Sequence, residues 1–520
     1  MHTSKVKVIF GPPGTGKTTT LLNILDSELH AGVPASRIAF VSFTRKAANE
    51  ARERAAAKFS LSMKDFLYFR TIHSLAYKRL SLRPGDVMQR SDWDEIGERV
   101  GCEFSGDYDL QEGVDQLRSQ EGDRVLALIG LARARQLHWS QGYDHQVFRG
   151  ERMFRERYLE IAKAVEEYKH ARSLVDFTDM LEYALERTLP LDIDVAVIDE
   201  AQDLSALQWE VCNHLFANAK RVYIAGDDDQ AIYRWAGADV RRFQGLRYDE
   251  RQVLDKSYRL PAAVYREACS ILGEIRERVP KTWAPRDDEG VVKVIAAPQY
   301  TPVGNGEEWL VLARTRFLVK QVSARLFHKG IPCTVFGRST VVEKHVTAMH
   351  VWAALQNREF IAADQVRALY ECMTDVPEDF DYHALPKKQL YSHALLTEKY
   401  GLRVPLRAEW ASALGGIPYS QCHYYERCID NGYDLAARPR IQLNTIHAVK
   451  GGECDNVLLM TDITPQQATA MSRPSTEESD DLHRVFYVGA TRARRSLYVS
   501  RSATSHEYGV MPCLRNSLTT

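Results

Sequence analysis

The segment Val6 to Thr20 constrains the fold of this chain more than any other part of the sequence. It reads VKVIFGPPGTGKTTT, in which a short apolar run precedes the glycine-rich sequence GPPGTGKT at residues 11–18. Apolar residues follow at helical spacing, and these are Leu21, Leu22, Ile24, Leu25 and Leu29. A strand, a glycine loop and a helix in this order form the context that a phosphate-binding loop requires.

The residue types in this loop suit a triphosphate. The three glycines allow backbone N–H groups to turn towards phosphate oxygens, and the N-terminus of the following helix adds positive potential. Lys17 can reach the β- and γ-phosphates, and the Thr18 hydroxyl can bind Mg²⁺. A glycine turn beside a solvated lysine is the alternative, but eight consecutive matching residues favour a nucleoside triphosphate site. The candidate nucleotide-binding residues here are Gly11, Gly14, Thr15, Gly16, Lys17, Thr18 and Thr19.

Composition limits the classes of protein and of binding partner that remain possible. A chain of 520 residues predicts several domains, and 68 basic against 69 acidic residues exclude bulk attraction to polyanions, so any nucleic-acid surface is local. The nine cysteines are scattered, and no leader or membrane-spanning run is evident, which favours a reduced, cytoplasmic protein without a membrane partner. Cys422, His423 and Cys428 lack the second ligand pair of a zinc site, so we expect free thiols there.

The order of apolar runs predicts an α/β fold. Strand-like runs alternate with helices at residues 37–43 and 66–70, with a helix expected from about Lys46 to Lys58. Residues 80–171 are charged and helical in pattern, which predicts an inserted helical subdomain. Strand-like runs recur after about Gly290, are interrupted from roughly Val341 to Arg440 by a second helical insertion, and then resume.

An acidic pair follows a buried strand pattern at residues 195–198. Asp199 can hold Mg²⁺, and Glu200 can orient or deprotonate the attacking water. Such a pair is usually a cap or a solvated turn when it stands alone. The phosphate loop upstream and the continuation AQD at residues 201–203 favour the second half of an NTPase site.

From these segments the chain resembles the UvrD/Rep/PcrA family of superfamily 1 helicases. The resemblance lies in DEAQD, in the segment from Tyr223 to Asp239, and in motifs spread in the family's order over nearly the whole chain. These further motifs are FTRKAANEARERA (43–55), TIHS (71–74), VDFTDML (175–181), LDKSYRLP (254–261), LNTIHAVKGGE (443–453) and RVFYVGATRARRSL (484–497).

The resemblance implies two RecA-like parallel-sheet motor cores, each interrupted by a mainly helical insertion. The first ATP-binding core would comprise residues 1–79 and 172–256, with an insertion at residues 80–171. The second would comprise residues 257–340 and 441–520, with a reduced insertion at residues 341–440. A second sheet without its own phosphate loop is consistent with a core that closes over the nucleotide of the first.

The resemblance also assigns roles around ATP. Gln230 would sense the γ-phosphate, while Arg259 and Arg492 would reach it and neutralise the charge that develops during transfer. Tyr258 matches the ring that stacks on adenine, and Glu453 matches the carboxylate that hydrogen-bonds the ribose. The glutamine segment that often precedes the loop in the family is not seen here, so base selectivity is expected to rest on Tyr258.

For the DNA path, the resemblance points to aromatic and polar residues in several motifs. Aromatic faces accept any base, which suits a protein that binds without regard to sequence. Buried core roles are the alternative for Trp235 and for both histidines, and Ala236 stands where the family often has an arginine. The candidate DNA-binding residues are Phe43, Thr44, His73, Trp235, Thr445 and His447.

The expected function is that of an ATP- and Mg²⁺-dependent translocase on single-stranded DNA and a DNA helicase acting on tailed duplexes, with 3′ to 5′ movement implied by the resemblance. The alternatives are an ATP-driven remodeller of protein–DNA complexes, or the helicase subunit of a nuclease complex without strong unwinding of its own. RNA as the track is a weaker variant. A nuclease or a replication or repair protein would be the partner in these cases, and the sequence does not identify the pathway.

Overall fold

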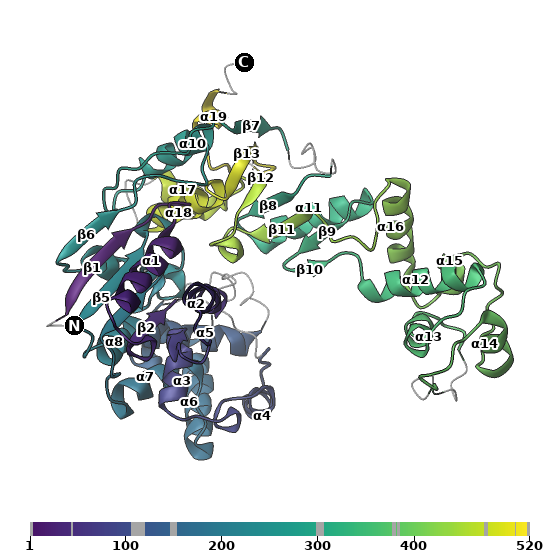
Figure 1. The fold of residues 1–520 in the computed structure, drawn as a ribbon, viewed down its shortest axis with the longest axis horizontal. Coiled ribbons are helices and arrows are strands. Elements are labelled where there is room, and N and C mark those ends of the chain that lie inside the picture. Colours follow the sequence, from purple (N-terminus) through teal and green to yellow (C-terminus); the bar gives the residue numbers. More distant parts are fainter. Residues whose placement is uncertain are drawn as a thin grey trace. The chain divides into compact units, whose positions relative to one another are not determined.

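The computed structural model describes residues 4–42, 45–105, 120–145, 153–297, 306–376, 381, 385–472, 477–504 and 506–516. The chain forms two compact units (Figure 1). The first contains Met1–Val294, Ile446–Glu453 and Thr461–Thr520, and the second contains Ile295–Thr445 and Cys454–Met460. The limits expected from the sequence divide the chain at other positions, because residues 257–294, 446–453 and 461–520 belong to the first unit.

A six-stranded sheet with the order β3-β2-β4-β5-β1-β6 forms the centre of the first unit. Every pair in it is parallel, and Lys5 to Phe10 of β1 run opposite Arg221 to Gly226 of β5. Its strands are β1 (Lys5–Phe10), β2 (Ile38–Val41), β3 (Tyr68–Arg70), β4 (Val195–Ile198), β5 (Arg221–Gly226) and β6 (Glu250–Val253).

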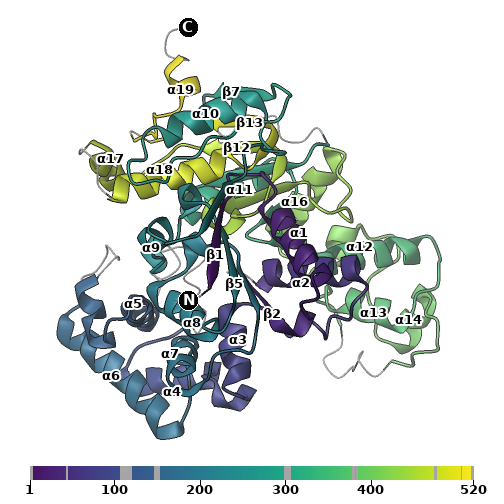
Figure 2. The same ribbon diagram turned by 60° about the vertical axis from the view of Figure 1, so that its left-hand side comes forward.

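Helices cover both faces of this sheet, as Figure 2 shows for α1 and α8 on opposite sides of β1 and β5. Alternate residues of a strand point to opposite faces, so Ile9 packs with α1 and α2 while Val8 packs with α3, α7 and α8. All four residues of β4 are buried, as in a central parallel strand. These helices are α1 (Lys17–His30), α2 (Arg45–Phe59), α3 (Ile72–Arg79), α7 (Phe177–Arg187) and α8 (Ala206–Leu215).

Between α3 and α7 the first unit contains a helical insertion with its own core. Its helices are α4 (Arg90–Val100), α5 (Glu121–Ala134) and α6 (Arg155–Arg172). The core includes Trp93 and Ile96 of α4, Ile129 of α5, and Tyr158 and Ile161 of α6. The apolar positions at helical spacing in the sequence are therefore the positions that pack here.

The remaining elements of the first unit lie after β5 in the chain. Helices α10 and α18 pack together, and α18 leads directly into the loop that carries Arg492. These elements are α9 (Val240–Gln244), α10 (Ala262–Leu272), β7 (Val291–Ile295, ending at the unit boundary), α17 (Pro465–Ser472), α18 (Glu477–Ala490), β13 (Ala493–Ser500) and α19 (Pro512–Asn516).

The second unit has strands in the order β10-β9-β11-β8-β12, with parallel pairs except for the β10–β9 pair. Helices α12 to α16 build a separate core around Trp352, Tyr391, Tyr424 and Tyr425. The elements are β8 (Trp309–Ala313), α11 (Arg316–His328), β9 (Cys333–Val335), β10 (Arg338–Ser339), α12 (Glu343–Gln356), α13 (Ala363–Tyr370), α14 (His393–Lys399), α15 (Trp410–Ala413), α16 (Tyr419–Asp430), β11 (Ile441–Thr445) and β12 (Cys454–Met460).

The α/β class with parallel, RecA-like sheets and helical insertions, expected from the sequence, is confirmed. All nine cysteines are free thiols, and Cys422 and Cys428 are buried in α16. Within the described part of the chain, no helix combines the length and apolar character needed to cross a membrane.

Candidate nucleotide site and nucleic-acid interface

The glycine loop between β1 and α1 has the backbone conformation that its sequence predicts. Gly14 and Gly16 have φ values of 71° and 82°, a region that favours glycine. The Lys17 ammonium donates a hydrogen bond to the Gly11 carbonyl at 2.9 Å. A Cβ atom at Gly11 would lie 2.0 Å from Cγ of Lys17, so glycine at position 11 leaves the space in which the lysine folds over the loop.

The N-terminus of α1 is open to an anion. Gly16 is the N-cap residue and provides no side-chain cap, so the first N–H groups of the helix have no side-chain acceptor there. Thr18 and Thr19 lie in this first turn. The Thr15 hydroxyl is directed elsewhere, since it donates to the Pro12 carbonyl at 2.7 Å and stabilises the loop.

The acidic pair lies at the carboxyl end of β4. Asp199 is buried, and Glu200 has a left-handed backbone conformation with φ 53°, which is uncommon for a residue other than glycine. The Glu200 carboxylate lies 3.7 Å from the Lys17 ammonium and accepts a 2.6 Å hydrogen bond from Gln202. Burial and the Glu200 charge raise the pKa of Asp199. Burial also opposes ionisation of Glu200, but the charges of Lys17, Lys450 and Arg492 and the hydrogen bond from Gln202 together lower its pKa.

Lys450 links this acidic segment to the turn that follows β5. Its ammonium lies 2.5 and 2.7 Å from the two Asp203 carboxylate oxygens and donates to the Gln230 carbonyl at 2.6 Å. Burial raises the pKa of Asp203 to about 6, although Lys450 opposes that shift. The short segment Ile446–Glu453, which carries Lys450, therefore joins two parts of the first unit.

Arg259 lies against the glycine loop. The Tyr258 N–H donates to the Gly14 carbonyl at 2.8 Å, the Ser257 hydroxyl donates to the Pro13 carbonyl at 2.7 Å, and a Cβ atom at Gly14 would lie 2.3 Å from Cβ of Arg259. The Tyr258 ring remains exposed beside the loop.

Arg492 is buried and completes the positive lining of the site. Its guanidinium donates to the Gln230 side-chain oxygen at 3.1 Å and to the Val488 carbonyl at 2.8 Å. Burial, followed by the charge of Arg259, lowers the pKa of Arg492. Two neighbouring guanidinium groups that repel each other in a buried site are stabilised by an anion.

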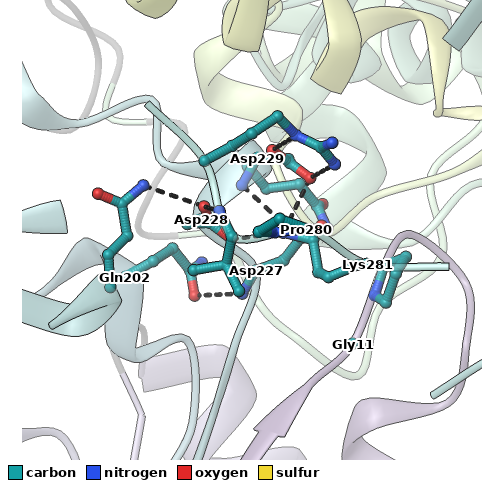
Figure 3. Close-up of polar contacts among 12 residues, drawn as sticks. Gly11, Gln202, Asp227, Asp228, Asp229, Pro280 and Lys281 are labelled. Atoms are coloured by element: carbon teal, nitrogen blue, oxygen red, sulfur yellow. Dashed lines mark hydrogen bonds and ion pairs between the residues drawn. The ribbon is translucent and has the colours of Figure 1, made fainter. Parts of the chain in front are cut away.

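The Gln230 amide is oriented from both sides. It accepts from Arg492, and its Nε2 donates to Asp227 at 2.7 Å. Asp227 in turn lies 2.8 Å from the fully buried Lys281 ammonium, which also pairs with Asp228 and Asp229 (Figure 3). A continuous chain of polar contacts from Lys281 to Arg492 therefore passes through Gln230.

Glu453 has a different partner in this structure from the ribose suggested by the resemblance. Its carboxylate accepts a 2.6 Å hydrogen bond from Nε of Arg259 and lies 3.5 Å from Arg494. The side chain is 39% exposed, so it lies at the mouth of the site. The ribose contact stays a prediction.

The residues present suit ATP and Mg²⁺. A threonine hydroxyl and a buried carboxylate are the hard oxygen ligands that Mg²⁺ prefers, and Thr18 and Asp199 supply them. Burial and the neighbouring Glu200 charge raise the pKa of Asp199, and a divalent cation bound beside it would oppose both effects. The open helix N-terminus, Lys17 and the two arginines suit the phosphates.

Among the predicted DNA-binding residues, His73 lines a cavity of about 330 Å³. Its ring contacts Phe177 edge to face, with the ring centroids 6.1 Å apart. Phe177 is 53% exposed at the start of α7, and Arg52, Arg70 and Tyr77 also line the cavity. Aromatic rings beside arginines form a surface that suits the bases and phosphates of a single strand.

Trp235 and His447 lie together, with their rings edge to face and the centroids 6.1 Å apart. Tyr233 donates to the His447 carbonyl at 3.0 Å, which holds the two segments together. Thr445 ends β11 in the second unit and is buried. Phe43 and Thr44 lie outside the described residues.

Sequence reasoning missed several residues of this region. Phe177 was part of a recognised motif, and its position directly after the helix cap Asp176 was a signal that it begins a helix and faces outward. Lys450 also lay within a recognised motif. Lys281 carried no signal, because no pattern in one sequence links it to acidic residues about fifty positions away.

The family models match most of the chain. Residues 1–250 match the UvrD/REP helicase N-terminal domain, and residues 429–504 match the UvrD-like helicase C-terminal domain. Together these matches cover more than half of the sequence, and they include the glycine loop, the acidic pair, Gln230 and Arg492.

Curated relatives agree with these models. The ATP-dependent DNA helicase PcrA of Leuconostoc citreum is 28% identical over 298 residues, covering 53% of this chain and 38% of the relative. The putative ATP-dependent DNA helicase YjcD of Bacillus subtilis is 24% identical, covering 63% and 46%. The ATP-dependent DNA helicase UvrD2 of Mycobacterium tuberculosis is 24% identical, covering 94% and 75%. The chain thus spans less than half the length of the first two relatives, and it belongs to the UvrD-like family of superfamily 1 helicases.

Proposed function

We propose that this chain is an ATP- and Mg²⁺-dependent motor that moves along single-stranded DNA, in the 3′ to 5′ direction, and separates the strands of tailed duplexes. One observation carries the proposal: the segment Ile446–Glu453 contacts both candidate sites. Lys450 contacts Asp203 and the Gln230 carbonyl on the nucleotide side, and the His447 ring lies 6.1 Å from Trp235. A nucleotide-dependent shift of this segment reaches the aromatic pair directly.

In the proposed hydrolysis of ATP, each side chain of the site has a separate role. Lys17 and the N–H groups at the start of α1 bind the phosphates, and Glu200 orients and deprotonates the attacking water. The low pKa of Glu200 keeps it ionised and able to accept a hydrogen bond from water at neutral pH. Arg259 and Arg492 stabilise the charge on the transferred group. Mg²⁺, held by Thr18 and Asp199, neutralises phosphate charge when bound.

The candidate site for single-stranded DNA accepts bases without regard to their sequence. The rings of Trp235, Phe177 and His73 offer faces to any base, and arginines beside the cavity attract phosphates. The similar proteins are named as DNA helicases, which supports DNA rather than RNA as the track. The direction of movement is proposed from the family resemblance alone.

The first test is ATP turnover with and without single-stranded DNA. We expect stimulation by the strand, and we expect Lys17→Ala to lose at least about a thousandfold of turnover, because its ammonium stabilises the transferred phosphoryl group. Lys64→Ala is the matched control, since this lysine is exposed away from the loop. Turnover that persists in Lys17→Ala would contradict the site assignment.

The second test is strand separation on duplexes with a single-stranded tail of either polarity. Unwinding that requires a 3′ tail supports the proposal, and unwinding that requires a 5′ tail contradicts the direction. Strand-stimulated hydrolysis without unwinding of either duplex would favour a remodeller instead. Stronger stimulation by RNA than by DNA oligomers would change the proposed track.

A further inference from the structure

The turn that carries Trp235 is connected to α18 by the neighbouring arginine. Arg234 and Trp235 belong to the same 3₁₀ turn, Arg234–Ala236. The Arg234 guanidinium lies 2.6 Å from Glu477 and 3.3 Å from Asp481, both in the first turns of α18. Its side chain is only 16% exposed, so it faces the helix and not the solvent.

The preceding turn is held by the same helix. Arg484 of α18 donates from Nε to the Asp228 carbonyl at 3.0 Å, and Asp228 begins the 3₁₀ turn that ends at Gln230. Arg484 also donates to Asp481 at 3.2 Å, so one carboxylate receives both arginines. The turn with the nucleotide-facing Gln230 and the turn with Trp235 are thus joined through one acidic group on α18.

The other end of α18 reaches the nucleotide site. The helix ends at Ala490, and Arg492 follows it, with its guanidinium on the Val488 carbonyl and on Gln230. Rigid secondary elements are among the carriers of coupling between distant sites, and α18 runs from the two carboxylates that contact Arg234 to the loop that carries Arg492. The structure therefore contains a continuous connection from Trp235, through Arg234 and α18, to Arg492.

We propose that Arg234 is a positioning residue that couples strand binding at Trp235 to the nucleotide site through α18. The inference rests on the proposed function, because it needs both ligands to bind. Both outer nitrogens of Arg234 already contact carboxylates, so it acts on the helix and does not serve as a phosphate contact. The Trp235 Nε1 atom is buried without an acceptor among the described residues, so the ring is held by packing and by its turn.

The test measures coupling at equilibrium in the full chain. The Kd of a labelled single-stranded oligodeoxythymidine is determined with and without a non-hydrolysable ATP analogue and Mg²⁺. Allosteric coupling between two sites typically changes affinity by about 5- to 150-fold. We expect such a factor in the unsubstituted chain and a factor close to one in Arg234→Gln, while the Kd without nucleotide stays within about twofold because Arg234 does not touch the strand.

Two further variants separate positioning from a general loss of charge. Arg241→Gln removes the second arginine on Glu477, which comes from α9 and not from the Trp235 turn, and we expect it to keep the coupling factor. Asp481→Asn removes the shared carboxylate from the helix side, and we expect it to lose coupling as Arg234→Gln does. Arg234→Lys keeps one charge but not the two-nitrogen contact, so partial recovery is expected.

Different outcomes overturn different claims. If nucleotide changes the Kd in the unsubstituted chain and equally in Arg234→Gln, this inference fails and the proposed function stands. If Arg234→Gln weakens strand binding without nucleotide as much as with it, Arg234 is a strand contact and the inference also fails. If the unsubstituted chain shows no effect of nucleotide on strand binding, both claims fail. Thermal melting of each variant confirms that it is folded.

Discussion

Glu200 occupies a strained backbone conformation at the end of a buried strand, and strain of this kind persists where the surrounding structure holds a residue firmly. Its carboxylate is fixed between Lys17 and Gln202. The left-handed turn brings this carboxylate back towards the phosphate loop, where an extended backbone would carry it onward with the chain. Position and charge together make it the base candidate in the site.

Replacing Glu200 by glutamine removes the base while it preserves size. We expect ATP turnover to fall by about 10²- to 10⁴-fold, the usual contribution of a positioned general base. ATP binding, measured with a fluorescent analogue, should persist because Lys17 and the loop remain. Glu210→Gln in α8 is the control, since that residue pairs with Arg242 at the surface. A turnover rate close to normal would assign the base to another residue.

The raised pKa of Asp203 predicts that the free energy of unfolding depends on pH. Its pKa is about 6 in the folded chain, because burial raises it, and about 3.9 in an unfolded chain. The folded state therefore keeps a proton that the unfolded state releases. The stabilisation from this group is fully present below about pH 4 and is lost as the pH rises through about 6, an effect of about 3 kcal/mol.

Asparagine at position 203 cannot ionise and lacks this dependence. We expect the free energy of unfolding of the unsubstituted chain to fall relative to Asp203→Asn between about pH 4 and pH 7, by up to about 3 kcal/mol. Urea denaturation of both proteins over this pH range measures the difference. Stability curves that run parallel across the range would contradict the raised pKa.

At the scale of elements, a buried ionic cluster holds the helical insertion to α7. Arg133 of α5 contacts Asp176, Asp179 and Glu182, at 3.1 Å to Asp176 and 2.6 Å to Glu182. Lys169 of α6 lies 2.7 Å from Asp176 and 2.9 Å from Asp179. Three helices thus meet at the capped N-terminus of α7, which also carries Phe177.

Arg133→Met should therefore destabilise the chain strongly. Removing one member of a buried ion network leaves unpaired carboxylates, at a cost of about 3–5 kcal/mol. Arg99→Gln provides a control in the same insertion, because its pair with Glu167 is exposed and contributes less than about 1 kcal/mol. Chemical denaturation compares the two. Equal free energies of unfolding for the two variants would mean that the buried ion pairs of Arg133 do not stabilise the folded state.

The cavity beside α3 and α7 supports a separate prediction about strand binding. Phe177→Ala should weaken the affinity for a single-stranded oligonucleotide by about 5- to 150-fold, since a stacked base contributes about 1–3 kcal/mol. Fluorescence anisotropy measures this affinity. Stability should change little because the ring is half exposed. Tyr248→Ala, another exposed aromatic residue of the first unit, should leave binding unchanged. Equal effects of the two substitutions would exclude a specific role for the cavity.

Across the whole molecule, local patterns were predictable and distant pairings were not. The loop at residues 11–18 can be predicted from the sequence because a phosphate-binding backbone requires glycines at particular positions. The parallel sheet follows from alternating strands and helices, and the expected helix at about residues 46–58 is α2. Each of these features depends on neighbouring residues in the chain.

The site depends on partners that are far apart in sequence. Arg259 pairs with Glu453, which is 194 positions away, and Arg492 contacts Gln230 across 262 positions. Periodicity and propensity do not specify such pairings, and only the resemblance suggested that Arg492 approaches the nucleotide. The burial of Lys281 could not be predicted for the same reason, because it depends on ion pairs with three aspartates that are distant in sequence.

The segment Ile446–Glu453 belongs to the first unit, although the strands on either side of it, β11 and β12, belong to the second. Both strands flank β8, so the segment leaves that sheet on one side of a single strand and returns on the other. Glu453 is bonded directly to the first residue of β12, and Lys450 is a few peptide links from either anchor. The groups that contact Arg259 and Asp203 are therefore joined to two strands of the second unit by only a few covalent links.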